Sequence, residues 1–177
     1  MSRISQSSLK ETSGISSEDF AETGVSVLFE LFLDGQGAFQ VLEYEDFVIC
    51  AIDNEEYQVN EASLTAMREW LLQNPTKPVI LLAHVPFYTE QNRSLLETTM
   101  SVWGQALVIG TGEGTRDTTA VSREFIEMIL GENSPVIAVL TGDNHFYHKG
   151  NLTDSIVQWV GAPAYEGDGM IIKIKGN

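Results

Sequence analysis

The sequence predicts an α/β fold with a mixed β-sheet and covering helices, and two observations lead to this prediction. Two short apolar runs without charge, at residues 79–83 and 136–141, have the composition of strands that are buried on both faces of a sheet. A segment with helical spacing of apolar residues precedes each run, at residues 63–72 and 118–130. Alternation of helices with buried strands is typical of parallel pairing, so we expect both strands in one sheet.

Length, composition and charge restrict the class of protein. A chain of 177 residues with 43% hydrophobic and 20% charged residues has the size and composition of one globular domain. The formal net charge of −15 repels phosphate backbones and argues against nucleic acid as a partner. No apolar run approaches the roughly 20 residues that cross a bilayer, so we expect no membrane partner. Cys50 is the only cysteine, which excludes a disulfide framework and favours a reducing compartment such as the cytoplasm.

The N-terminal part of the chain divides into an arm and the start of the folded unit. Residues 1–18 are rich in Ser, Thr and Glu and lack the basic and apolar segments of a secretory signal, so we expect a flexible N-terminal arm. Residues 19–177 are expected to form one folded unit. Between residues 19 and 33, apolar residues recur at a spacing that favours a short helix, although the β-branched content also fits a strand.

Two strand candidates follow, at residues 38–44 and 47–53. The two residues between them, Glu45 and Asp46, form the kind of short connection that predicts a hairpin. An acidic loop begins at Asp53. We expect the Asp53 carboxylate to accept hydrogen bonds from nearby backbone N–H groups, as acidic side chains at strand ends commonly do, and not to bind a metal.

The segment after this hairpin predicts a βαβ unit. Asn60 fits the N-cap position of a helix, with the acidic residue Glu61 in its first turn. Apolar residues then recur at helical spacing until the pattern ends before Pro75. Because this helix leads directly into the run at residues 79–83, we expect that run to pair in parallel with residues 47–53.

The remaining segments have weaker signals. Residues 86–105 contain several aromatic side chains and a short helix candidate at residues 94–102, and this segment is a candidate wall of a site because it follows the first buried run. The Gly-rich residues 110–114 do not match a dinucleotide fingerprint, because the third Gly comes too early and Glu113 would repel a pyrophosphate. We therefore expect a flexible loop there. Three short runs after residue 145, separated by turns, are expected to form an antiparallel tail of the sheet.

Metal-ligand side chains follow both buried runs, at the point where each run ends. His84 comes directly after the first run, and Asp143 and His145 come after the second, behind a Gly. Open α/β sheets build their sites at the carboxyl ends of their strands. Neutral imidazole suits Zn, Fe and Mn, and carboxylate oxygen suits harder ions such as Mn, so these three side chains predict a divalent-metal site. His148, slightly further on, is expected to have a surface role.

These runs resemble the late motifs of the calcineurin-like metallophosphoesterase superfamily. Residues 83–86 (Ala-His-Val-Pro) resemble a family strand that ends in His, one residue and Pro, and residues 142–145 (Gly-Asp-Asn-His) resemble the Gly-His-x-His motif. Residues 47–53 resemble the family strand that ends in Leu-Asp, and residues 63–72 resemble the helix with a Trp-Leu pair. The resemblance extends from about residue 38 to the end, and the order and spacing of the motifs together make it fairly specific.

The resemblance implies a phosphoester hydrolase that uses two divalent metal ions, of Mn, Fe or Zn, on a small-molecule phosphoester substrate. By that resemblance, His84 would bind the second ion and His145 the first. Asp143 stands where the family has a His on the second ion. The implied fold is a four-layer αββα sandwich of two mixed sheets, of which this chain would supply mainly one sheet and its helices.

The early motifs of the family, Asp-x-His, Gly-Asp-x-x-Asp and Gly-Asn-His, have no counterpart before His84. Residues 19–177 therefore resemble the C-terminal portion of such a domain, and we expect weak or absent hydrolysis by the isolated chain. Half a sandwich would expose an apolar sheet face, so we expect a homodimer, pairing with the missing N-terminal half, or an N-terminal segment that covers the gap.

Two other functions remain open from the sequence. The first is a non-catalytic interaction or scaffold domain that keeps the fold without metals, which the replacement of a family His by Asp143 and the missing ligands would favour. The second is a nucleotide-binding domain built on residues 110–114, which is the weakest candidate because that loop does not match the fingerprint.

Overall fold

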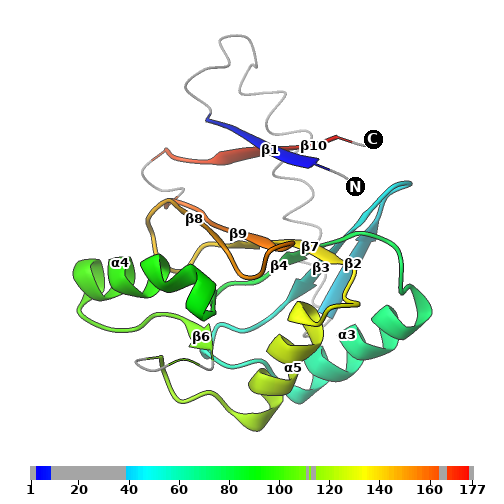
Figure 1. Cartoon of the computed structure of the whole chain (residues 1–177), viewed down its shortest axis with the longest axis horizontal. Helices are drawn as coiled ribbons and strands as arrows, with labels where there is room; N and C mark the ends of the chain where they lie inside the picture. The colour runs from blue at the N-terminus through cyan, green and yellow to red at the C-terminus, as the bar shows by residue number, and fades with distance from the viewer. Residues whose placement is uncertain (1–2, 9–38, 111, 113–114, 164–166, 176–177) are drawn as a thin grey trace.

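The computed structural model describes residues 3–8, 39–110, 112, 115–163 and 167–175 (Figure 1). The helix expected between residues 19 and 33 lies outside these residues. The described strands are β1 (Arg3–Ser8), β2 (Phe39–Glu43), β3 (Val48–Ile52), β4 (Val79–Leu82), β5 (Phe87–Tyr88), β6 (Ile109–Gly110), β7 (Val136–Thr141), β8 (His148–Asn151), β9 (Val157–Val160) and β10 (Met170–Lys175). The described helices are α3 (Glu61–Gln73), the short 3-10 helix η3 (Glu90–Asn92), α4 (Arg93–Trp103) and α5 (Ala120–Leu130).

A six-stranded mixed sheet with the order β2-β3-β4-β7-β9-β8 forms the centre of the molecule. Strands β3, β4, β7 and β9 pair in parallel, and the edge strands β2 and β8 pair antiparallel with β3 and β9. The predicted α/β fold, a mixed sheet with covering helices, is therefore confirmed. The predicted β2–β3 hairpin and the β3-α3-β4 unit are both present. The larger four-layer sandwich stays a prediction.

The C-terminal strands differ from the expected antiparallel tail. Strands β8 and β9 pair antiparallel as expected, but β9 lies parallel to β7. Residues 142–156 supply the dozen or more residues that a parallel connection needs, and a sequence pattern does not show which neighbour a strand takes. Strand β10 lies outside the sheet and pairs antiparallel with β1. Residues 3–8 of the expected flexible arm thus form a strand, and the rest of residues 1–18 lies outside the described part.

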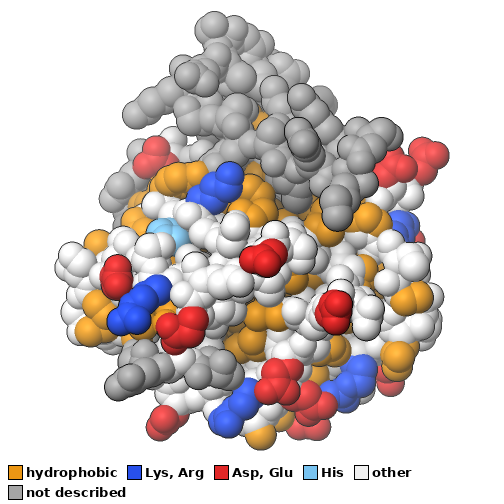
Figure 2. All heavy atoms as spheres, viewed as in Figure 1, with side chains coloured by type: hydrophobic (Ala, Val, Ile, Leu, Met, Phe, Trp, Pro, Cys, Tyr) orange, Lys and Arg blue, Asp and Glu red, His pale blue; other side chains and the backbone are white. Residues whose placement is uncertain are grey.

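The surface carries charges of both signs with acidic groups in excess, in keeping with the net charge of −15. On the face shown in Figure 2, acidic and basic side chains are scattered among neutral and apolar ones. Among the residues that the structure describes, no helix is both long enough and apolar enough to cross a bilayer.

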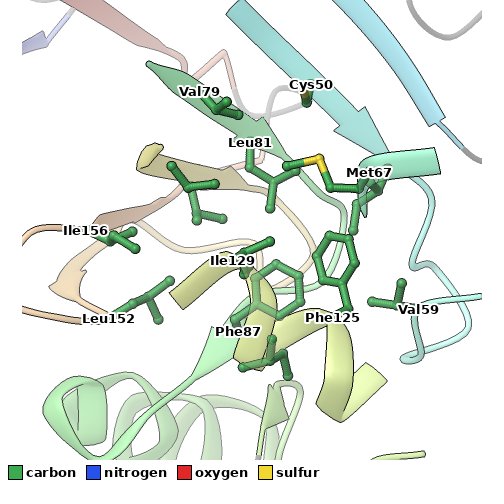
Figure 3. Close-up of a cluster of buried hydrophobic side chains, with 14 of the residues drawn as sticks. Cys50, Val59, Met67, Val79, Leu81, Phe87, Phe125, Ile129, Leu152 and Ile156 are labelled. Carbon is green, nitrogen blue, oxygen red and sulfur yellow. The ribbon is translucent and has the colours of Figure 1, made fainter. Parts of the chain in front are cut away.

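The main core lies between one face of the six-stranded sheet and helices α3 and α5 (Figure 3). Met67 from α3 and Phe125 and Ile129 from α5 lie with Leu81 of β4, and all four side chains are fully buried. Burial of one such side chain stabilises a fold by about 1.5–3 kcal/mol, so this interface is a main source of stability. Cys50 of β3 belongs to the same core, where burial and, to a lesser extent, the charge of Glu43 raise the pKa of its thiol to about 12.

Side chains cap both of the helices that cover this face. At the start of α3, Asn60 Oδ1 accepts a hydrogen bond of 2.8 Å from the Ser63 backbone N–H, which confirms the predicted N-cap. At the start of α5, Thr119 Oγ1 accepts one of 3.2 Å from the Ser122 backbone N–H. Such caps satisfy N–H groups that have no partner in the first helical turn, and each contributes about 1 kcal/mol.

The opposite face of the sheet is also apolar. Ile80, Ala138 and Trp159 are buried on it. Partly buried apolar side chains surround these three residues: Phe47, Ile49, Ile137, Leu140, Val157 and Met170. Both faces of the central strands are therefore apolar, as their uncharged sequences predict.

Candidate metal centre

The parallel strands bring several loops to one edge of the sheet. Strands β3, β4 and β7 run in the same direction, so their carboxyl ends lie together. The loops after β4 and β7 touch, as the sequence predicts: the His84 carbonyl accepts hydrogen bonds from the backbone N–H groups of Gly142 (3.2 Å) and Asp143 (3.1 Å). The two segments that carry the predicted ligands are thus joined through their backbones.

Asn54, at the end of β3, holds the loop after β4. Its Oδ1 accepts hydrogen bonds from the backbone N–H groups of His84 (2.8 Å) and Val85 (3.0 Å), and its Nδ2 donates to the Val85 carbonyl (2.9 Å). The Asn54 side chain is buried, so it satisfies backbone groups that water does not reach. The position of His84 relative to the sheet therefore depends on Asn54.

His84 and Asp143 form the centre of the site. His84 Nε2 lies 3.1 Å from Asp143 Oδ1. The side chain of His84 is 52% exposed and that of Asp143 is 14% exposed, so solvent reaches the pair mainly on the imidazole side. A separation of 3.1 Å is that of an ordinary hydrogen bond between an imidazole and a carboxylate. Two ligand atoms that bind one metal ion at about 2.1 Å in tetrahedral geometry are about 3.4 Å apart. The two side chains therefore contact each other directly, and a small outward movement of either would give the spacing of two ligands on one ion.

The described residues contain no group of three or more His, Cys, Asp or Glu side chains placed to hold a metal ion. His84 and Asp143 are therefore two of the predicted ligands in contact, without a third such side chain beside them among the described residues. His145, the third predicted ligand, follows Asp143 by two residues on an exposed turn. The structure brings two of the three predicted ligands into contact and leaves the third beside them in the chain.

Tyr57 is hydrogen-bonded to the second carboxylate oxygen of Asp143. Its hydroxyl donates a hydrogen bond of 2.7 Å to Asp143 Oδ2. The Arg116 guanidinium lies over the Tyr57 ring, 3.8 Å from the ring centroid. Burial, followed by the hydrogen bond to Asp143 and the charge of Asp143, raises the pKa of Tyr57 to about 12, and Arg116 opposes this shift. The phenol therefore keeps its proton and remains a donor at neutral pH.

Two strained backbone positions flank Asp143. Among the described residues, Tyr57 and His145 are the non-glycine residues with positive φ, at 59° and 54°. A side-chain-bearing residue in this left-handed region costs of order 1 kcal/mol or more, and such residues concentrate at functional sites. Tyr57 reaches Asp143 through its hydroxyl, and His145 belongs to the same loop as Asp143. The strain therefore marks the same part of the molecule as the predicted ligands.

Helix α4 supports the loop that carries Asp143 and His145. Trp103 Nε1 donates a hydrogen bond of 2.9 Å to the Asn144 carbonyl, and Asn144 Nδ2 donates one of 3.0 Å to Thr99 Oγ1. The Trp103 ring lies edge-on to the His145 ring, with centroids 6.2 Å apart. The helix predicted at residues 94–102 is thus confirmed, and its last residue contacts the candidate site.

Two other predicted residues lie outside the central pair. Asp53 Oδ1 accepts a hydrogen bond of 3.1 Å from the Glu55 backbone N–H, so the predicted capping role is confirmed. His148 Nε2 lies 3.1 Å from Ser94 Oγ, next to the start of α4. Most of the loop at residues 110–114 lies outside the described part of the chain, so its flexibility stays a prediction.

Comparison of the chain with models of known protein families gives no match, and comparison with curated protein sequences gives none either. The resemblance to calcineurin-like metallophosphoesterases therefore rests on the motif residues.

The sequence-based prediction did not include Asn54, Tyr57 or Arg116. The contact between Asn54 and His84 spans 30 positions of the chain, and the contact between Tyr57 and Asp143 spans 86. Neither contact has a local sequence pattern. Asn54 could have been found from its place directly after a predicted strand, at the edge where the ligands were expected.

Proposed function

We propose that this protein is a divalent-metal-dependent phosphoester hydrolase of the calcineurin-like type, with His84, Asp143 and His145 as ligands of its metal centre. The observation that supports this proposal most is the 3.1 Å separation of His84 Nε2 and Asp143 Oδ1 across two strand ends. Imidazole nitrogen and carboxylate oxygen are ligands that Mn, Fe and Zn accept. The carboxyl edge of the sheet is where open α/β folds carry such centres.

The residues present fit part of such a centre. His84 and Asp143 would hold the ion, and His145 is the nearest further imidazole in the chain. A bound divalent cation would supply Lewis acidity, which stabilises the charge that develops on a phosphoryl group during hydrolysis. It would also place positive charge locally, where an anionic phosphoester binds, on a chain whose net charge is −15. The chain's own contribution is to fix the two ligands, through Asn54 and Tyr57.

Two ligands in contact are too few for a centre with two ions, so we expect the isolated chain to hydrolyse phosphoesters weakly. In this proposal the remaining ligands come from a second copy or from another polypeptide. Hydrolysis of 4-nitrophenyl phosphate in the presence of Mn²⁺ tests the proposal. We expect slow turnover that His84→Ala and His145→Ala abolish and that His148→Ala leaves unchanged. Turnover that survives His84→Ala would contradict the proposal.

A second candidate function is a non-catalytic interaction domain, and one specific observation favours it. Both carboxylate oxygens of Asp143 already have neighbours, since Oδ1 contacts His84 and Oδ2 accepts the Tyr57 hydrogen bond. A carboxylate with both oxygens engaged can act as a structural link between loops without an ion. Absence of divalent metal in the protein isolated from its native source would favour this candidate over the hydrolase.

A further inference from the structure

We propose that Tyr57 is the positioning residue that holds Asp143 against His84 and favours binding of a metal ion through Asp143 Oδ1 alone. The link to a metal ion rests on the proposed function, whereas the positioning of Asp143 stands on the contacts alone. The Tyr57 hydroxyl donates to Asp143 Oδ2 at 2.7 Å, while Oδ1 lies 3.1 Å from His84 Nε2. The carboxylate cannot rotate without losing one of these two contacts.

The backbone N–H groups of Tyr57 and His84 both donate hydrogen bonds to Asn54. The Tyr57 N–H donates a hydrogen bond of 3.0 Å to the carbonyl of Asn54, whose side chain in turn holds the His84 N–H. Tyr57 also adopts a left-handed conformation, with φ of 59°. Strain at such a position persists only where the surrounding structure fixes it. One residue, Asn54, thus sets the places of both residues that contact the Asp143 carboxylate.

The Arg116 side chain packs on one face of the Tyr57 ring. Its guanidinium carbon lies 3.8 Å from the ring centroid, within the range of a cation–π contact. Its Nε donates to the Ala106 carbonyl at 3.0 Å, and its Nη2 donates to Gln105 Oε1 at 3.2 Å. A planar guanidinium held by two hydrogen bonds is a fixed surface for the ring to pack on. The phenol is therefore held in place as a donor to Asp143.

This arrangement has a consequence for the choice of ion. Ca²⁺ takes about six to eight oxygen ligands and often binds a carboxylate through both oxygens, whereas Mn²⁺ and Zn²⁺ accept imidazole nitrogen beside a single carboxylate oxygen. With one lone pair of Oδ2 used by the hydroxyl, Oδ1, next to His84 Nε2, is the oxygen more available to an ion, and binding through both oxygens is disfavoured. We therefore expect the site to prefer Mn²⁺ to Ca²⁺, and this preference depends on the Tyr57 hydroxyl.

Titration of the full chain with Mn²⁺ and with Ca²⁺ tests this consequence. Tyr57→Phe removes the hydroxyl and keeps the ring that Arg116 covers. We expect its Mn²⁺ affinity to fall about 10- to 100-fold, the size of effect seen when a partner of a metal ligand is lost, and its Ca²⁺ affinity not to fall. Tyr44→Phe is the matched control, because Tyr44 stacks on Phe47 at the opposite end of β3, and it should leave both affinities unchanged.

A second measurement, on the metal-free protein, separates this inference from the proposed function. We expect Tyr57→Phe to shift the NMR signals of the His84 imidazole, because the Asp143 oxygen beside it moves, and Tyr44→Phe to leave them in place. If the wild type binds no metal but these signals shift, the proposed function is wrong and the positioning role of Tyr57 stands. Unchanged His84 signals together with an unchanged Mn²⁺ affinity in Tyr57→Phe would overturn the inference.

Discussion

At the scale of single residues, Asn54 has the largest expected effect on the candidate site. Its side chain makes three hydrogen bonds to the backbone of His84 and Val85, and it is only 1% exposed. We predict that Asn54→Ala lowers the free energy of unfolding by at least about 2 kcal/mol, because backbone groups beneath the site lose their partners. Urea denaturation followed by circular dichroism measures this loss.

Asn60→Ala is the matched control for this variant. Asn60 also bonds to the backbone through its side chain, but it makes a single hydrogen bond, to the Ser63 N–H, at the start of α3. We expect the loss of this cap to cost about 1 kcal/mol. If Asn54→Ala proves no more destabilising than Asn60→Ala, the three hydrogen bonds of Asn54 do not hold the His84 loop.

The partly buried imidazole of His148 should make the free energy of unfolding depend on pH. Its Nδ1 is buried without a hydrogen-bond partner among the described residues, and its Nε2 contacts Ser94 Oγ. Burial lowers the pKa of His148 below its ordinary value of 6.5, so the folded protein takes up this proton at a lower pH than the unfolded chain does. The unfolded state therefore binds more protons over this range, and stability falls as the pH drops through 6.5 toward the folded-state pKa.

The variant His148→Gln keeps a polar side chain and removes the titration. We predict that the free energy of unfolding of the wild type falls more steeply than that of His148→Gln between about pH 7.5 and about pH 5. Urea denaturation at a series of pH values gives both curves. Parallel curves would show that protonation of His148 does not oppose folding.

At the scale of elements, the pairing of β5 with β6 depends on a glycine. A Cβ added at Gly110 would lie 2.6 Å from the Tyr88 carbonyl oxygen and 2.8 Å from the Tyr88 Cβ. We predict that Gly110→Ala lowers the free energy of unfolding by about 1–3 kcal/mol, because backbone atoms cannot move aside easily. At Gly142 an added Cβ meets nothing within 4 Å, so Gly142→Ala should change stability by less than about 0.5 kcal/mol. Equal losses in thermal or urea denaturation would contradict this account of the pairing.

The elements that the sequence predicts well are those with a local periodic signal. Strands β3, β4 and β7 and helices α3 and α5 have apolar patterns of sufficient length and clear boundaries, such as Asn60 at the start of α3. The errors concern mainly the partners of strands, apart from residues 3–8, which were expected in a flexible arm and form β1. Strand β9 was expected in an antiparallel tail but pairs in parallel with β7, and β10 pairs with β1, because strand pairing depends on distant segments that a pattern does not identify.

The candidate site likewise contains residues that the sequence predicts and residues that it does not. His84 and Asp143 could be predicted because each directly follows a recognisable strand and parallel strands share one edge. Tyr57 and Arg116 could not, since each sits in an irregular loop and reaches the site only through the folded structure. Sequence reasoning thus identified two side chains that meet in the folded structure and missed those that hold them in place.

At the scale of the whole molecule, the apolar sheet face that α3 and α5 do not cover is a candidate surface for association with another polypeptide chain. Met170 of β10 packs against this face, and several side chains of the sheet there, among them Leu140, are only partly buried. We propose that this face takes part in pairing with a second copy or with a polypeptide that supplies further ligands. Analytical ultracentrifugation should then show a species heavier than the monomer, which Leu140→Glu weakens because a charge is costly to bury.

Leu72→Glu is the control for this experiment. Leu72 is 77% exposed on α3 and lies away from the apolar face, so this variant should associate like the wild type. A wild type that sediments as a monomer at every concentration would contradict self-association and leave pairing with another polypeptide as the remaining form of the proposal.

The central claim is that His84 and Asp143, which meet at the ends of two parallel strands, bind a divalent metal ion. Calorimetric titration of the full chain with Mn²⁺ tests it most directly, with His84→Ala and the control His148→Ala measured alongside. We predict that the wild type and His148→Ala bind Mn²⁺ with similar affinity and that His84→Ala does not bind it. Binding by His84→Ala as tight as that of the wild type, or no binding by the wild type, would contradict the claim.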